Sequence, residues 1–171
     1  MREILFRGFT PDEDGKDKAF VNGEWIKGQW VQGSYMKLSK TTYCFKEDYE
    51  ANPDNTEHYI VFDQMTDWGL PNRHLQADIL PETAGQYTGL TDKNNKRIFE
   101  GDIVVCSQAI QGNFIDEHVE TGYVEMKHGA FGLHRKQGYY RPFKDWLEDY
   151  EYEVIGNIHD NPELLKGGAG K

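Results

Sequence analysis

The sequence predicts a mainly β protein, all-β to α+β, with few short helices. Ten Tyr, nine Phe and four Trp favour strands, because aromatic side chains suit a pleated, half-buried surface. Eighteen Gly suit tight turns and bulges. The apolar residues also occur in short runs separated by turn residues, a pattern typical of strands. With 171 residues, of which 37% are hydrophobic, the chain can form one domain or two small ones.

The first third of the chain predicts a meander of short strands. Asn22-Gly23 is its best hairpin signal, because both residues tolerate the positive φ of a two-residue turn. Gly33 is expected to mark a bulge or a corner between two strands. The strands expected in this region are residues 4–8, 18–21, 24–28, 29–31 and 34–38.

The next segment begins with an acidic stretch. Residues 47–57 hold five acids and no base, and with Pro53 they predict a solvated loop. Residues 58–64 predict a strand. Residues 67–73 contain Gly69 and Pro71 and predict a loop.

The stretch from Ile79 to Val104 alternates turn residues with single apolar anchors. Pro81 ends an extended segment, and Gly85 and Gly89 can take positive φ at either end of Gln86-Tyr87-Thr88. Asp92–Lys96 predicts a turn, and Asn there tolerates the left-handed conformation. Glu100-Gly101-Asp102 predicts a tight corner before the β-branched strand 103–106.

The last third predicts further strands and a terminal helix. Residues 120–126 and 130–134 are expected to form a hairpin around His128-Gly129, and residues 150–158 form a final strand. Asp160-Asn161-Pro162-Glu163 predicts the start of a helix of about two turns, because it combines a capping side chain, an early Pro and an acid.

Three separated motifs resemble the YopX family of phage and prophage proteins. They are the opening Met1–Gly8, the central "PETxGQYTGLTDKNxKxIFEGDIV", and the closing residues 154–165. The residues of this structural motif are Pro81, Gly85, Gln86, Tyr87, Gly89, Asp92, Gly101, Asp102, Asn161 and Pro162. Asn95 stands where the family pattern leads us to expect Gly, and this difference affects only the predicted type of the turn at residues 92–96. The resemblance implies a mostly β protein with an SH3-like small barrel in its second half, and a family without an established biochemical function.

The predicted organisation has three parts. Residues 1–82 form an N-terminal β-rich region, residues 83–165 the SH3-like barrel with a short terminal helix, and residues 166–171 a flexible tail. The boundary is expected between Pro81 and Gly89.

No catalytic, metal or cofactor motif is found. None of the six His lies at a ligand spacing from another His or Cys, although His128 and His134 could meet across a turn. Glu100 and Asp102 could share a face as paired carboxylates, but Asp102 beside Gly101 is better explained as an acceptor for backbone N–H groups in the corner. Cys44 and Cys106 lie in apolar settings and predict buried free thiols in a cytosolic protein. We therefore expect no enzyme and no cofactor.

Two charged regions are candidate binding surfaces. Lys93, Lys96 and Arg97 form a basic cluster that could contact nucleic acid, or merely keep a turn soluble. The net charge of −10 disfavours general attraction to nucleic acid and to anionic membranes. Residues 145–163 hold seven acids and no Lys or Arg, beside aromatic residues; this is a solvated strand face or a surface for a basic partner. The candidate partner surface consists of Trp146, Tyr139, Tyr140, Glu148, Asp149, Glu151 and Glu153.

These observations favour a non-enzymatic protein-binding or self-associating module, whose partner is a host or phage protein or a second copy. The alternatives are a nucleic-acid-associated small barrel and an uncharacterised enzyme. The absence of a long apolar run and of a signal peptide predicts no membrane association and a cytoplasmic location in a bacterial host. We also expect a homo-oligomer, because short-stranded sheets leave edges to cover.

Overall fold

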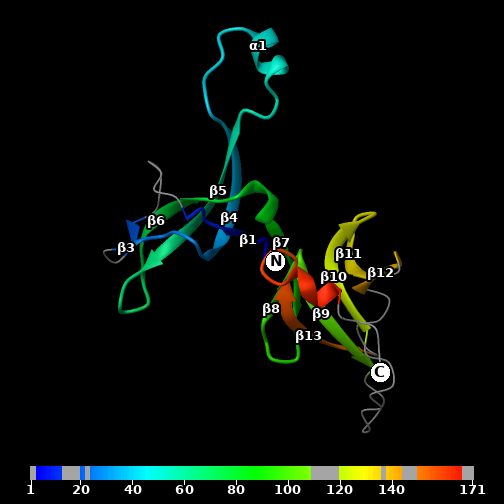
Figure 1. Ribbon diagram of the computed structural model, residues 1–171. Helices are drawn as coiled ribbons and strands as arrows, with labels where there is room; N and C mark the ends of the chain where they lie inside the picture. Colours follow the sequence, from blue (N-terminus) through cyan, green and yellow to red (C-terminus); the bar gives the residue numbers. More distant parts are fainter. Residues whose placement is uncertain are drawn as a thin grey trace. The chain divides into compact units, whose positions relative to one another are not determined.

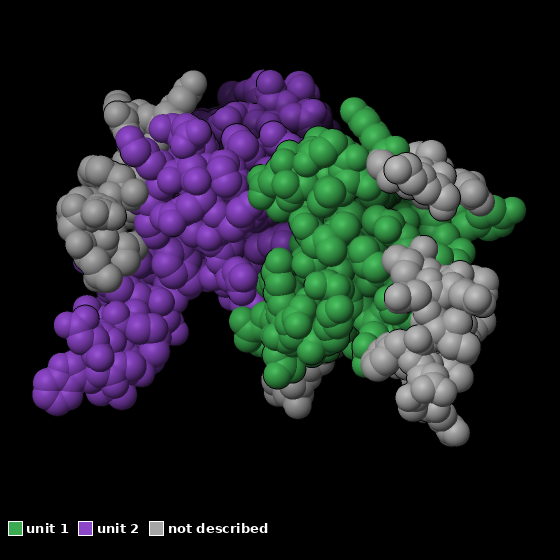
Figure 2. Space-filling model, turned by 60° about the horizontal axis from the view of Figure 1, so that its bottom comes forward, with its two compact units in different colours: residues 1–3, 85–171 green, residues 4–84 purple. Residues whose placement is uncertain are grey.

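The computed structural model describes residues 3–12, 20–21, 24–108, 120–135, 138–143 and 150–166. The fold is mainly β, as predicted, with a single α-helix among these residues. The chain divides into two compact units, residues 4–84 and residues 1–3 with 85–171 (Figures 1 and 2). In the described part of the chain, no helix is long and apolar enough to cross a membrane.

The unit of residues 4–84 is built on an antiparallel sheet in the order β6-β5-β4-β1. Its elements are β1 (Phe6–Phe9), β2 (Phe20–Val21), β3 (Glu24–Trp25), β4 (Trp30–Ser39), α1 (Lys46–Ala51), β5 (Thr56–Met65), β6 (Pro71–Asp78) and a 3-10 turn (Pro81–Thr83). One face of the sheet carries the core, formed by Ile26, Val31, Ile60, Leu75, Ala77 and Ile79. β2 and β3 pair with each other, which confirms the hairpin predicted from Asn22-Gly23, although these two residues lie outside the described ones.

Three predictions for this unit were wrong. β4 runs without a break through Gly33, which is neither a bulge nor a corner. Glycine is needed there because an added Cβ would lie 2.1 Å from the carbonyl oxygen of Val61. The predicted acidic loop contains α1 and the start of β5. The predicted loop 67–73 contains the start of β6, because Pro71 can begin a strand at the edge of a sheet.

The second unit holds a five-stranded antiparallel sheet in the order β12-β11-β10-β9-β13. Its elements are β7 (Gly85–Thr91), β8 (Arg97–Phe99), β9 (Asp102–Gln108), β10 (Glu120–Lys127), β11 (Ala130–Arg135), β12 (Tyr140–Pro142), β13 (Tyr150–Asn157) and a 3-10 helix (Pro162–Leu165). β7 and β8 pair as a hairpin, and β10 and β11 pair around His128-Gly129 as predicted. The core consists of Ile98, Val104, Cys106, Val124, Phe131, Leu133, Phe143, Tyr152 and Val154.

The terminal helix is shorter than predicted. It is a 3-10 helix over Pro162–Leu165, without a side-chain cap from Asn161. The Asn161 backbone is not in the extended conformation typical of a capping residue (φ −133°, ψ 46°), and this explains the missing cap. The SH3-like form of this unit stays a prediction.

Candidate functional site

Asp92 of the predicted motif is a buried structural carboxylate. Its Oδ1 accepts hydrogen bonds from the backbone N–H of Asn94 (2.8 Å) and Lys96 (2.9 Å), and its Oδ2 accepts one from Val154 of β13 (3.1 Å). Burial alone would raise the pKa of Asp92, but the three N–H donors outweigh it and lower the pKa below its ordinary value. Asp92 therefore joins the β7–β8 turn to the outer edge of β13.

The glycines and the asparagine of the motif either adopt a positive φ or leave room for a close backbone contact. Gly89 and Gly101 have φ of 88° and 81°, and Asn95 has φ of 62°, the left-handed conformation that its turn predicted. Gly85 has no positive φ; a Cβ on it would lie 2.5 Å from the carbonyl oxygen of Glu100. The motif thus shapes the turn and the corner of this unit.

The two carboxylates of the Glu100-Gly101-Asp102 corner are engaged with the backbone. Asp102 is 1% exposed and accepts a hydrogen bond from the N–H of Phe99 (2.7 Å). Glu100 accepts one from the N–H of Met126 (3.2 Å). Both carboxylates thus serve as acceptors for backbone N–H groups of the corner and its neighbours, which suits a structural role.

Three of the described histidines each contact a different neighbouring side chain. His58 accepts or donates a hydrogen bond to the Tyr35 hydroxyl (2.6 Å), His74 contacts Asp63 (2.6 Å), and His134 contacts Glu125 (2.7 Å). His134 of β11 lies opposite Tyr123 of β10, whereas His128 lies in the turn that joins these strands, several residue pairs away. The structure therefore does not bring these two histidines together. Within the described ranges, no three His, Cys, Asp or Glu side chains gather into a metal site.

The two cysteines differ in environment. Cys106 is buried in the core, and burial raises the pKa of its thiol to about 11, so it is protonated and unreactive at neutral pH. Cys44 is exposed, which corrects the prediction that both thiols are buried. Cys44 lies directly before the exposed Phe45.

The basic cluster of residues 93–97 is largely offset by acids. Lys93 contacts Glu153 (2.6 Å), and Arg97 contacts Glu3 (3.2 Å). This pairing weakens the case for nucleic acid at the turn, because a phosphate would have to displace a carboxylate already in place.

The predicted acidic, aromatic surface is only partly described. Tyr139 is 68% exposed, and Glu151 is exposed. Tyr140 is half-buried and donates its hydroxyl to the carbonyl oxygen of Ala130, and Glu153 is paired with Lys93. Trp146, Glu148 and Asp149 lie outside the described residues. Of the described acids of this surface, Glu151 is exposed and Glu153 is already paired with a base, and the surface stays a prediction.

Two exposed apolar regions that the sequence did not predict lie in the unit of residues 4–84. The first is the α1 arm, residues 40–55 between β4 and β5, where Phe45 and Tyr49 are 68% and 55% exposed. The second is the tip of the β5–β6 hairpin, with Met65, Trp68 and Leu70. The two regions lie at opposite ends of β5 (Figure 1). A signal for the second was visible: Trp68 and Leu70 flank a glycine in a segment with turn residues.

A shallow groove of about 580 Å³ lies over the sheet of the same unit. Val61 and Leu5 contribute apolar lining, and Ser34, Asp63 and His74 contribute polar lining. The groove holds one His–carboxylate pair, Asp63 with His74, and the hydroxyl of Ser34. In the described part of the chain no hydrogen bond joins Ser34 to His74, so the arrangement lacks the nucleophile–base contact that activates a serine.

Comparisons with known proteins give a match to a solved structure and a match to a family model. A solved structure, protein EF1440 from Enterococcus faecalis, matches at a TM-score of 0.43 with 21% sequence identity, covering 96% of this chain and 99% of that chain. A search of curated proteins finds no match. The family model described as YopX protein matches residues 21–166. This match spans most of the chain, and the protein therefore belongs to the YopX family.

Proposed function

We propose that this YopX-family chain is a non-enzymatic protein-binding module, and that its partner contacts the α1 arm. In keeping with the family resemblance, we place it in the cytoplasm of a bacterium that carries the phage or prophage. Support comes from the backbone-bound carboxylates of Glu100 and Asp102 and from the separation of His128 and His134 described above, which favour binding over catalysis.

The observation that carries the proposal is that α1 buries none of its own residues. A helix of six residues is marginal in water, and helices in proteins gain most of their stability by packing an apolar face. α1 does not pack such a face on its own unit; Tyr49 contacts Tyr43 edge to face at 5.6 Å, and Phe45 stays exposed. The aromatic surface of the α1 arm, at the end of β4 and β5, is therefore available to a partner.

The charge of the α1 arm indicates the chemistry of the partner. Acids outnumber bases in the arm: Glu47, Asp48, Glu50 and Asp54 against Lys40 and Lys46. Lys46 is further offset by Glu50 at 2.9 Å. A protein surface with an apolar pocket and a basic rim complements this pattern, and such binding weakens as salt is added.

Cys44 offers a direct test, because it is exposed beside Phe45 whereas Cys106 is buried. A benzophenone maleimide on Cys44 is photolysed in bacterial lysate, and cross-linked proteins are identified by mass spectrometry before and after nuclease treatment. We expect a cross-link that survives nuclease and is lost in the F45S/Y49S variant, which keeps Cys44. The matched control is C44S/E163C, which carries the probe on the exposed Glu163 position.

Equal cross-linking from position 163, or an unchanged cross-link in F45S/Y49S, would show that the α1 arm is not the binding surface. Loss of the cross-link after nuclease would instead indicate a nucleic-acid-associated protein.

A further inference from the structure

We propose that two copies of this chain form a twofold-symmetric dimer in which the β5–β6 tip of each copy enters the groove of the other. This goes beyond the proposed function, since it uses a separate surface and a different occupant. The α1 arm lies at the other end of β5 and stays available (Figure 1).

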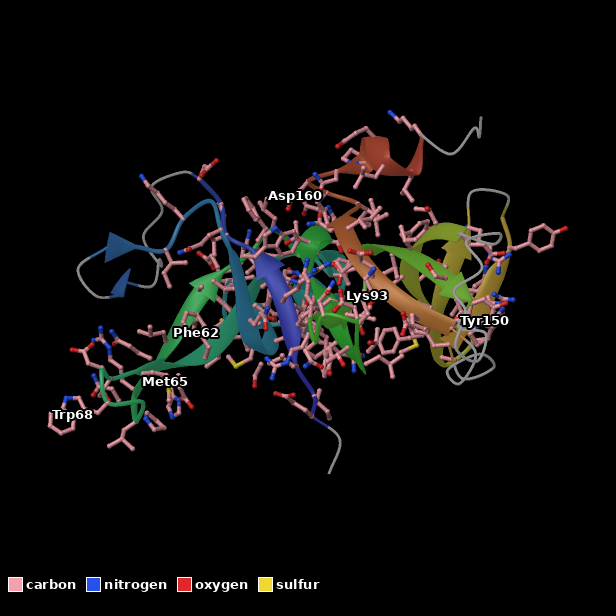
Figure 3. The ribbon with its side chains drawn as sticks, turned by 90° about the horizontal axis from the view of Figure 1, so that it is seen from below. Phe62, Met65, Trp68, Lys93, Tyr150 and Asp160 are labelled. Atoms are coloured by element: carbon pink, nitrogen blue, oxygen red, sulfur yellow. The ribbon has the colours of Figure 1, made fainter. Side chains whose placement is uncertain are left out.

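The tip is an apolar projection. Trp68 is 89% exposed, Leu70 63% and Met65 50%. Figure 3 shows Trp68 at the far end of the hairpin, with Met65 between it and Phe62. Trp is the residue most typical of binding hot spots, and an exposed Trp beside two further apolar side chains indicates a contact surface.

The tip is also held in one conformation. The N–H of Thr66 donates to the carbonyl oxygen of Leu70 (2.8 Å), and the N–H of Gly69 donates to that of Thr66 (2.9 Å). The Thr66 hydroxyl oxygen accepts a third bond, from the N–H of Leu70 (3.2 Å). Gly69 takes a φ of 73°, which closes the turn. A preorganised turn loses little conformational entropy when it binds.

The groove lies on the same hairpin as the tip. Its lining includes Val61, Phe62 and Asp63 of β5 and His74 of β6, next to Ser34 of β4. Its volume of about 580 Å³ is in the range of pockets that hold small ligands, roughly 300–1,000 Å³. A twofold interface requires the projection and the pocket to lie on one patch of one chain, because each copy presents the same patch. This hairpin meets that requirement.

Area and charge both favour a second copy as the occupant. The three tip side chains expose roughly 400 Å² of mostly apolar surface, about half of the ~800 Å² that each partner buries in a stable interface. In a reciprocal dimer each copy also buries its groove, which supplies the remainder. Residues 61–76 carry Asp63, Asp67 and Arg73, close to neutral, whereas the whole chain has a net charge of −10. Two copies can therefore approach here with little repulsion.

The test is a complementation experiment by sedimentation velocity from 1 to 100 μM. Wild type is expected to dimerise. W68S/L70S lacks the tip, and S34R fills the groove from an exposed position on β4; each alone is expected to weaken dimerisation at least tenfold. An equimolar mixture of the two restores one of the two tip-in-groove contacts, so it is expected to give heterodimer at concentrations where each variant alone is monomeric.

F45S/Y49S is the matched control and is expected to dimerise like wild type. Far-UV circular dichroism and thermal midpoints establish that all variants fold. A monomeric wild type at 100 μM overturns the proposal, and so does an S34R protein that dimerises normally or a mixture that remains monomeric. None of these results bears on the α1 arm, whose cross-link is measured separately.

Discussion

Replacing Asp92 by Ala tests how the unit of residues 85–171 is held together. Three backbone N–H groups lose their acceptor. Those of Asn94 and Lys96 lie in an exposed turn and can bond to water, whereas Val154 is a buried residue of β13. A buried donor without an acceptor costs about 1–3 kcal/mol, and a hydrogen bond to a charged group is worth about 1.5–3 kcal/mol. Both figures describe the loss of the Val154 bond and are not added, so we expect a loss of about 1–3 kcal/mol, a large part of the stability of a small domain.

The same carboxylate predicts a pH dependence. The pKa of Asp92 is lowered in the folded chain by its backbone donors, while the unfolded value is about 3.9. A group with a depressed folded pKa contributes stability that is fully present above the unfolded pKa and lost as pH falls through the folded pKa. The contribution of Asp92 is therefore complete near pH 6, begins to fall near the unfolded pKa of about 4, and is lost as pH drops further through the lower folded pKa; D92A lacks this part of the acid dependence.

Urea denaturation at a series of pH values between 2.5 and 7 measures both effects, with amide hydrogen exchange at Val154 as a local probe. The control is E151Q, which removes an exposed acid of the same strand. A D92A protein within 1 kcal/mol of wild type at pH 7, or one whose stability falls with acid as steeply as wild type, would refute this reasoning.

Three further predictions concern single positions. Gly33→Ala forces a Cβ to within 2.1 Å of the Val61 carbonyl oxygen, so we expect a loss of about 1–3 kcal/mol in urea denaturation; a loss no larger than that of the neighbouring control S34A would contradict it. Gly101→Ala places a side chain at φ 81° and should cost about 1–2 kcal/mol, and an unchanged midpoint would show that the corner relaxes freely. Iodoacetamide at pH 8 should modify Cys44 rapidly and Cys106 only after unfolding, because burial raises the Cys106 pKa to about 11; equal rates by mass spectrometry would show that the core opens readily.

The strands and turns of this chain follow from local patterns. The β-branched run before Cys106 forms β9, and the positive φ of Asn95 follows from side-chain chemistry within its own turn. Gly33 could not be predicted in this way. Its role depends on the approach of β5, which is distant in sequence, and the same glycine would equally suit a bulge.

Exposure was the harder property to predict. Trp68 and Trp30 are the same residue type, yet Trp30 packs against Phe9 at a ring-centroid distance of 5.5 Å while Trp68 projects into solvent. The local sequence identifies a residue that is able to pack in a core, but it does not identify the distant segment that would bury that residue. Helix α1 likewise could not be predicted from the acidic residues 47–57. A helix that buries none of its residues needs no apolar face, so its sequence lacks the helical spacing of apolar residues.

The contact between Asp92 and β13 has a further consequence for solubility. An outer strand normally presents a row of amide and carbonyl groups onto which another chain can add, as occurs in fibres. Here the turn that carries Asp92 and Lys93 occupies that row at its centre, since Asp92 binds the Val154 N–H and the Lys93 N–H binds the Tyr152 carbonyl. A foreign strand must first displace this turn, so the acid blocks fibre growth along β13 as well as stabilising the unit.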